Sequence, residues 1–200
     1  AASDVYKRQL LDFQATLETK PEKAIKLEKD ALAQIENITA DNARLVSNLH
    51  ANLGGLYRMN GHPDLAREHM EKSISLLDQF NLLHINDSIP QIANYAMFLT
   101  EQQEPERGIS ELQKLSGIIK EYHSDDCLDY AKVQETLGTI YLMTANLPQA
   151  KTHFKRAFKI YEKIWADEPE MIEAKYQEIQ ELYPQIGFCI GKNLSGLLTK

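Results

Sequence analysis

The chain has 200 residues, of which 43% are apolar and 26% charged, and its formal net charge at pH 7 is −7. This composition is typical of a folded globular protein and too apolar for a disordered one. The negative charge and the lack of a basic patch with interleaved aromatic residues argue against a nucleic-acid partner, and no apolar run approaches the roughly 20 residues that would span a membrane.

The first residues stand apart from the rest of the chain. Residues 4–9 read D-V-Y-K-R-Q, which is identical to one translated frame of a transposase adapter used in sequencing libraries. One interpretation of residues 1–9 is therefore a scar of sequence assembly. The alternatives are chance and the genuine start of an amphipathic helix, and these residues carry none of the functional argument.

Helical patterns then follow one another in pairs, with a turn inside each pair and a longer link after it. The expected helices are 10–18, 22–38, 42–59, 63–80, 88–102, 105–122, 127–145, 148–167, 170–183 and 188–200. Grouped in pairs, they predict repeats at about 10–41, 42–83, 84–125, 126–167 and 168–200, forming a single domain over 10–200.

The repeat has a fixed period of 42 residues. The run L-G-G-L-Y at 53–57 recurs as L-G-T-I-Y at 137–141, and a weaker copy at 95–99 lies halfway between them. Prolines at 21, 63 and 105 keep the same spacing, at a position where a helix start tolerates proline. A fixed period of this length predicts an array in which each helix pair packs only on its neighbours. Gly54 and Gly138 would let the two helices of a pair touch.

This signature resembles the tetratricopeptide repeat, and its period resembles the 42-residue variant of kinesin light chains and many bacterial proteins. Residues 137–165 carry the resemblance best, and Asn52 and Asn94 match the second Asn of the variant's N-N-L-A-x-L-Y stretch. The chain departs from the variant's L-G-x-x-H-P link, since W-A-D-E-P stands at 165–169. Over about 20–183 the resemblance implies an all-α, right-handed superhelical solenoid of antiparallel helix pairs, with four to five repeats.

The resemblance also implies a concave groove, lined by the first helix of each pair, that binds extended peptides. The chain would then be a non-enzymatic protein- or peptide-binding scaffold. Asparagines suit a peptide backbone, cations an acidic group, and methionines an adaptable apolar contact, although each residue alone is equally typical of an ordinary helix face. Carried over by register, the groove candidates are Asn48, Asn52, Arg58, Met59, Asn94, Met97, Glu101, Lys132, Glu135, Thr139 and Leu142, with Ala51, Gly55, Ala93, Thr100, Thr136 and Met143 beside them.

Some of these repeats hold an acidic chain terminus between lysine, asparagine and arginine side chains. The residue types are supplied by Asn52, Asn94, Arg58 and Lys132. Because Glu101 and Glu135 would face the same groove and repel such a ligand, we do not expect this clamp here.

The remaining polar residues indicate no catalytic chemistry. His69 and His153 lie 84 residues apart, so they occupy equivalent places and we interpret both as structural. His62 is expected in a turn, and His50, His84 and His123 have no cysteine or carboxylate at metal-ligand spacing. Cys127 and Cys189 predict no disulfide framework, which favours a reducing, cytoplasmic location. We therefore expect no enzyme activity, no cofactor and no metal. Two alternatives remain: a peptide-sensing module of a larger signalling or transcription regulator, and assembly as a homodimer.

Overall fold

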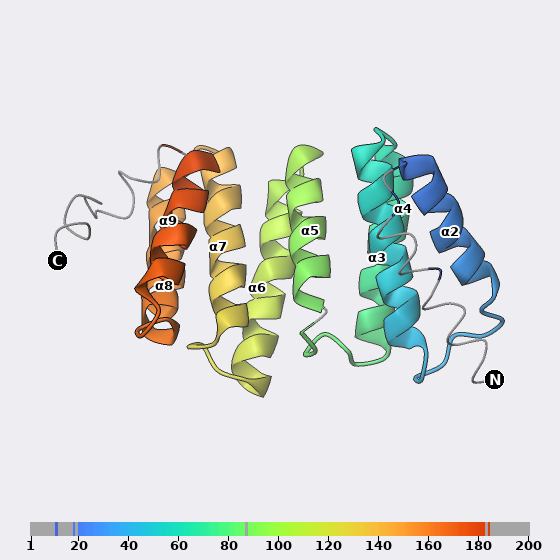
Figure 1. The fold of residues 1–200 in the computed structure, drawn as a ribbon, viewed down its shortest axis with the longest axis horizontal. Coiled ribbons are helices and arrows are strands. Elements are labelled where there is room, and N and C mark those ends of the chain that lie inside the picture. Colours follow the sequence, from blue (N-terminus) through green and yellow to red (C-terminus); the bar gives the residue numbers. More distant parts are fainter. Residues whose placement is uncertain (1–10, 12–17, 19, 87, 183, 185–200) are drawn as a thin grey trace. The chain divides into compact units, whose positions relative to one another are not determined.

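The computed structural model describes residues 11, 18, 20–86, 88–182 and 184. Within these residues it contains eight α-helices and no β-strand, which confirms the predicted all-α class (Figure 1). The helices are α2 (Pro21–Ala33), α3 (Ala43–Met59), α4 (Pro63–Gln79), α5 (Ser88–Glu101), α6 (Pro105–Tyr122), α7 (Leu128–Met143), α8 (Leu147–Ile164) and α9 (Pro169–Leu182).

The second helices of the pairs keep the period seen in the sequence. Helices α2, α4, α6 and α8 begin at residues 21, 63, 105 and 147, which are 42 residues apart. The first three begin with a proline, and α8 has its proline at the second position, where the missing N–H still has no intrahelical partner.

The second helix of the first repeat is shorter than expected. We predicted 22–38, but α2 ends at Ala33. The link that follows is held by Asn42, whose side chain donates to the carbonyl of Asn37 at 2.9 Å and accepts from the N–H of Thr39 at 2.8 Å. Asparagine competes for backbone groups in this way and favours turns over helix. The predicted helices at 10–18 and 188–200, and residues 1–9, lie outside the described residues except for Leu11 and Glu18.

The chain divides into two compact units, residues 1–98 and 99–200, with the boundary inside α5. In the first unit α3 packs against both α2 and α4. In the second unit α7 packs against α6 and α8, and α9 against α8. Each unit has its own core of fully buried side chains, such as Leu49 and Leu53 in the first and Leu137 and Phe154 in the second.

Two glycines account for the close packing inside the pairs. A Cβ on Gly54 would lie 2.6 Å from Cγ of Met70, and one on Gly138 would lie 2.9 Å from the ring of Phe154. Real Cβ atoms do not approach so closely, so a larger residue would force the helices apart. The predicted contact of the two helices at these glycines is confirmed.

The turn between the helices of a pair also recurs. Gly61, Gln103 and Ala145 have φ angles of 72°, 67° and 59°, and they are 42 residues apart. In each turn the next residue's N–H donates to the carbonyl five residues before it, at 2.7 to 2.9 Å, which is the Schellman way of ending a helix. Glycine adopts this left-handed conformation at no steric cost, whereas Gln103 and Ala145 adopt it against the steric hindrance of their Cβ atoms.

Candidate functional site

A pocket of about 220 Å³ lies in the first unit and is built by α3, α4 and α5. We call it the first-unit pocket. Five of its residues are groove positions expected from the sequence, namely Ala51, Gly55, Arg58, Met59 and Asn94. The other three are Met70, Ser73 and Gln91.

A buried polar network forms one wall of this pocket. Gln91 Oε1 accepts from Oγ of Ser47 at 2.8 Å and from Oγ of Ser73 at 2.5 Å, and its Nε2 donates to Oδ1 of Asn48 at 2.6 Å. Ser47, Ser73 and Gln91 are buried. Because each of these groups has a partner, the network holds α3, α4 and α5 in a fixed arrangement.

The pocket is open at Gly55 on α3, which has no side chain. A Cβ on Gly55 would meet nothing within 4 Å, in contrast to the neighbouring Gly54. Met59, one turn further along α3, is 81% exposed. Neither packing nor backbone conformation therefore requires glycine at position 55, where it costs about 1 kcal/mol of helix stability relative to alanine. Its physical effect is to keep the pocket open.

The other predicted positions of the first unit are placed next to the pocket or away from it. Asn48 is half-buried and accepts from Gln91, as described above. Asn52 is half-buried and donates to Oε1 of Glu28 on α2 at 3.0 Å. Met97 is half-buried, and Asn94 is exposed at the rim.

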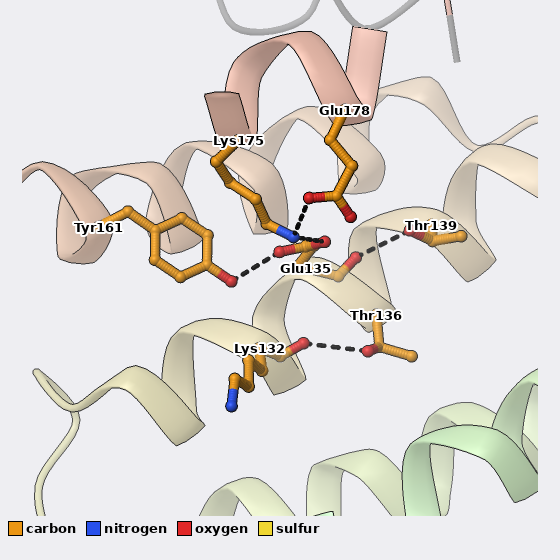
Figure 2. Close-up of polar contacts among 7 residues, drawn as sticks. All are labelled: Lys132, Glu135, Thr136, Thr139, Tyr161, Lys175 and Glu178. Carbon is orange, nitrogen blue, oxygen red and sulfur yellow. Dashed lines mark hydrogen bonds and ion pairs between the residues drawn. The ribbon is translucent and has the colours of Figure 1, made fainter. Parts of the chain in front are cut away.

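In the second unit the equivalent place is filled by an ion-pair cluster (Figure 2). Lys175 on α9 lies 2.9 Å from Oε1 of Glu135 on α7 and 3.1 Å from Oε2 of Glu178. The phenol of Tyr161 donates to the other oxygen of Glu135 at 2.6 Å. Glu135 and Lys175 stand 84 residues after Ala51 and Gln91, so two residues of the first-unit pocket correspond to the two ends of this ion pair.

The charges of this cluster stabilise one another. Burial alone would lower the pKa of Lys175, but the carboxylates of Glu135 and Glu178 outweigh it and hold the pKa above its usual value. Burial raises the pKa of the Tyr161 phenol, and Glu135 adds to the rise. At neutral pH Glu135 thus accepts from an ammonium and a protonated phenol at once.

The remaining predicted positions lie in α7 and at the end of α5. Thr139, which stands where the first unit has Gly55, donates its hydroxyl to the carbonyl of Glu135 at 3.1 Å (Figure 2). Lys132 is exposed and lies 3.8 Å from Asp129. Leu142 is half-buried, and Glu101 is exposed.

The histidines lie in equivalent surroundings in the two units. His69 stacks on Tyr57 with ring centroids 5.4 Å apart, and His153 stacks on Tyr141 at 5.3 Å. Nδ1 of His69 lies 2.9 Å from Nδ1 of His50, and His153 makes the matching contact with an amide oxygen at 2.9 Å. The described residues contain no group of three or more histidine, cysteine or acidic side chains that could hold a metal ion.

Sequence reasoning missed Met70, Ser73 and Gln91 because they come from the second helix of the pair and from the next pair. The register of the first helices maps one helix face and does not show what closes a pocket from the side. A weak signal was present, since Gln91 and Lys175 are polar residues at equivalent positions.

Comparison with known proteins bears on the fold. Residues 88–163 match the tetratricopeptide repeat family. The crystal structure of BtubC (BKLC) from P. vanneervenii is similar with a TM-score of 0.67 and 20% sequence identity, over 80% of this chain. The chain spans 63% of the length of that protein. Among curated protein sequences, none matches.

Across the described residues, no helix is both long and apolar enough to cross a membrane. The helix pairs, their recurrent turn and the family match agree on one architecture. Tetratricopeptide repeats in general are scaffolds for protein–protein interaction. The helix pairs of this chain have the architecture of the tetratricopeptide repeat, whose family model matches residues 88–163.

Proposed function

We propose that this chain is a non-enzymatic scaffold that binds an extended segment of a partner protein, and that the first-unit pocket receives one side chain of that segment. The observation that carries the proposal is the open wall at Gly55. It costs helix stability, serves no contact within the protein and lies beside the exposed Met59.

The size and lining of the pocket support a peptide side chain as its occupant. A volume of about 220 Å³ is below the roughly 300–1,000 Å³ of sites for drug-sized molecules. Met59 and Met70 offer adaptable apolar contacts. Arg58 and Asn94 line the same pocket with groups suited to a carboxylate or a peptide backbone.

The test begins with peptides selected against the wild-type chain from a random displayed library, whose dissociation constants are then measured by fluorescence anisotropy. Gly55→Leu adds a side chain at a position that lines the pocket and where a Cβ would meet nothing within 4 Å, and leucine favours helix over glycine. We expect roughly tenfold weaker binding or more, because a pocket filled from within loses its central contact.

Matched controls separate occlusion from a general effect. Gly117 lies inside α6, is exposed and would also have open space around a Cβ, so Gly117→Leu makes the same change away from the pocket. A second test variant, Met59→Ala, shortens a side chain that lines the pocket. Its control is Met143→Ala, which makes the same change two repeats later. Equal binding by all four variants, or a library from which no peptide is retained, would contradict the proposal.

A further inference from the structure

Helix α8 is basic in an acidic protein. Its sequence holds five cations and one glutamate, although the chain as a whole has a net charge of −7. Four of the cations, Lys151, Lys155, Lys159 and Lys163, stand at every fourth position, and all are exposed. We call these four residues the lysine stripe. They occupy the face of α8 opposite its buried residues, such as Phe154 and Phe158.

The stripe has few partners among the described residues, and Lys163 and Lys159 both lower the pKa of Asp126. Like charges four residues apart on a helix repel each other and destabilise it. Lys163 pairs with Asp126. Lys151, Lys155 and Lys159 make no hydrogen bond or ion pair within the part of the chain that the structure describes. The spacing of these lysines is therefore not explained by the stability of this unit, and binding of another molecule would explain it.

A recessed site lies beside the middle of the stripe. A pocket of about 430 Å³ has cations on two sides, Lys155, Arg156 and Lys159 from α8 and Lys120 from α6. The Lys120 ammonium lies 5.2 Å from the ring centroid of Tyr130, which also lines the pocket. We call this the basic pocket, and it lies entirely within the second unit.

The spacing of the stripe matches an extended chain. Four residues of an α-helix rise about 6 Å, and two residues of an extended strand rise about 6.6 to 6.8 Å. Acidic side chains at alternate positions of an extended segment would thus have nearly the same spacing as successive lysines of the stripe.

We propose that the lysine stripe and the basic pocket bind an extended acidic segment of a partner protein, with carboxylates at alternate residues. This site is separate from the first-unit pocket and does not depend on the function proposed for it. The charge complementarity is local, because this helix holds five cations and one glutamate in a chain whose net charge is −7.

Two observations favour a protein segment over a polyphosphate. Asp125 and Asp126 also line the basic pocket, and the hydrogen bond from Lys163 holds the pKa of Asp126 below its usual value, so it stays ionised. These carboxylates would repel densely spaced phosphates, but they can accept hydrogen bonds from the N–H groups of a peptide. The net charge of the chain also opposes long-range attraction of a nucleic acid.

The test measures binding of the full chain to a fluorescein-labelled peptide of alternating glutamate and serine by anisotropy at about 0.1 M salt, where the Debye length is about 10 Å. The variant Lys155→Glu with Lys159→Glu should bind roughly tenfold more weakly or worse, because the attraction becomes repulsion. The same variant should be no less stable in urea, since each substitution places a glutamate four residues from a lysine. A stable chain that has lost binding separates recognition from folding.

The matched control is Lys23→Glu with Lys26→Glu on α2, which makes the same change in net charge at exposed positions in the first unit. It should bind within about twofold of wild type, because neither residue belongs to the lysine stripe or lines the basic pocket. Equal losses in both variants would show a net-charge effect only and overturn the proposal. So would equal binding of a peptide with its glutamates in one block, absence of binding by the wild-type chain, or tighter binding of single-stranded DNA or of vesicles containing phosphatidylserine.

Discussion

Adjacent glycines in α3 should respond to the same substitution with opposite signs. A Cβ on Gly54 would lie 2.6 Å from Cγ of Met70 and 3.2 Å from its backbone nitrogen. A Cβ on Gly55 would meet nothing within 4 Å. Both residues lie inside the same helix, so Gly54→Ala and Gly55→Ala share the same gain in helix propensity and differ only in what the new methyl group touches.

The magnitude follows from these two contributions. Replacing an interior helical glycine by alanine stabilises by about 1 kcal/mol, and forcing a methyl group into a filled contact costs about 1–3 kcal/mol. Gly55→Ala should therefore raise the free energy of unfolding by about 1 kcal/mol. The free energy of unfolding of Gly54→Ala should be about 1–3 kcal/mol lower than that of Gly55→Ala. Both variants gain the same helix propensity, so this gain cancels in the comparison.

The assay is urea unfolding followed by far-UV circular dichroism, with the slope of free energy against urea checked to be equal in the two variants. A thermal melt should separate them by about 2–4 °C per kcal/mol for a chain of this size. The reasoning would be refuted if Gly55→Ala destabilised the protein as much as Gly54→Ala. That result would mean that the open wall of the first-unit pocket is packed in solution.

Four further predictions concern other contacts. Gly138→Leu should destabilise by about 1–3 kcal/mol in urea, because the new side chain meets an aromatic ring; an unchanged melt would count against this packing. Burial and the neighbouring histidine lower the pKa of His50 from 6.5 to about 4, so the unfolded state takes up its proton first and stability should fall by about 1–2 kcal/mol as the pH drops through that window. His50→Gln introduces the residue found two repeats later and should weaken the dependence of stability on pH. An unaltered profile of stability against pH would exclude His50 as the cause of that dependence. Lys175→Met should lower the free energy of unfolding by about 1–2 kcal/mol, because Glu135 loses the ammonium that pairs with it. Adding Glu135→Gln should restore part of that stability. Additive losses in this double-mutant cycle would argue against the ion pair. Ala145→Gly should raise the melting temperature by relieving a left-handed φ of 59°, and a lower value would contradict that turn.

The sequence predicted the helix pairs well because two independent rules agree on the period. Prolines at 21, 63 and 105 mark helix starts, and the glycines at 54 and 138 mark close contacts. Both are local constraints, so they can be recognised without knowing the fold. The end of α2 was misjudged because an apolar face continues past Ala33 while Asn42 holds the backbone in a turn.

The candidate sites were only partly predictable. Register placed Ala51, Gly55 and Met59 on one face of α3, and they do line a pocket. It could not show that Gln91 closes that pocket from the next helix pair, or that Lys175 reaches Glu135, because both contacts depend on how two pairs dock. The lysine stripe was visible as a spacing of four, but its meaning depends on which of those lysines have partners.

The equivalence of Gln91 and Lys175 has a consequence for exchanging repeats between positions. Gln91 meets two serine hydroxyls and an asparagine, whereas Lys175 meets Glu135. If α9 were moved onto the first pair, its ammonium would face Ala51 instead of a carboxylate, and α5 moved onto the fourth pair would leave Glu135 without a cation. These two junctions are therefore not interchangeable, so a repeat transplanted between them must carry the first helix of the next one with it.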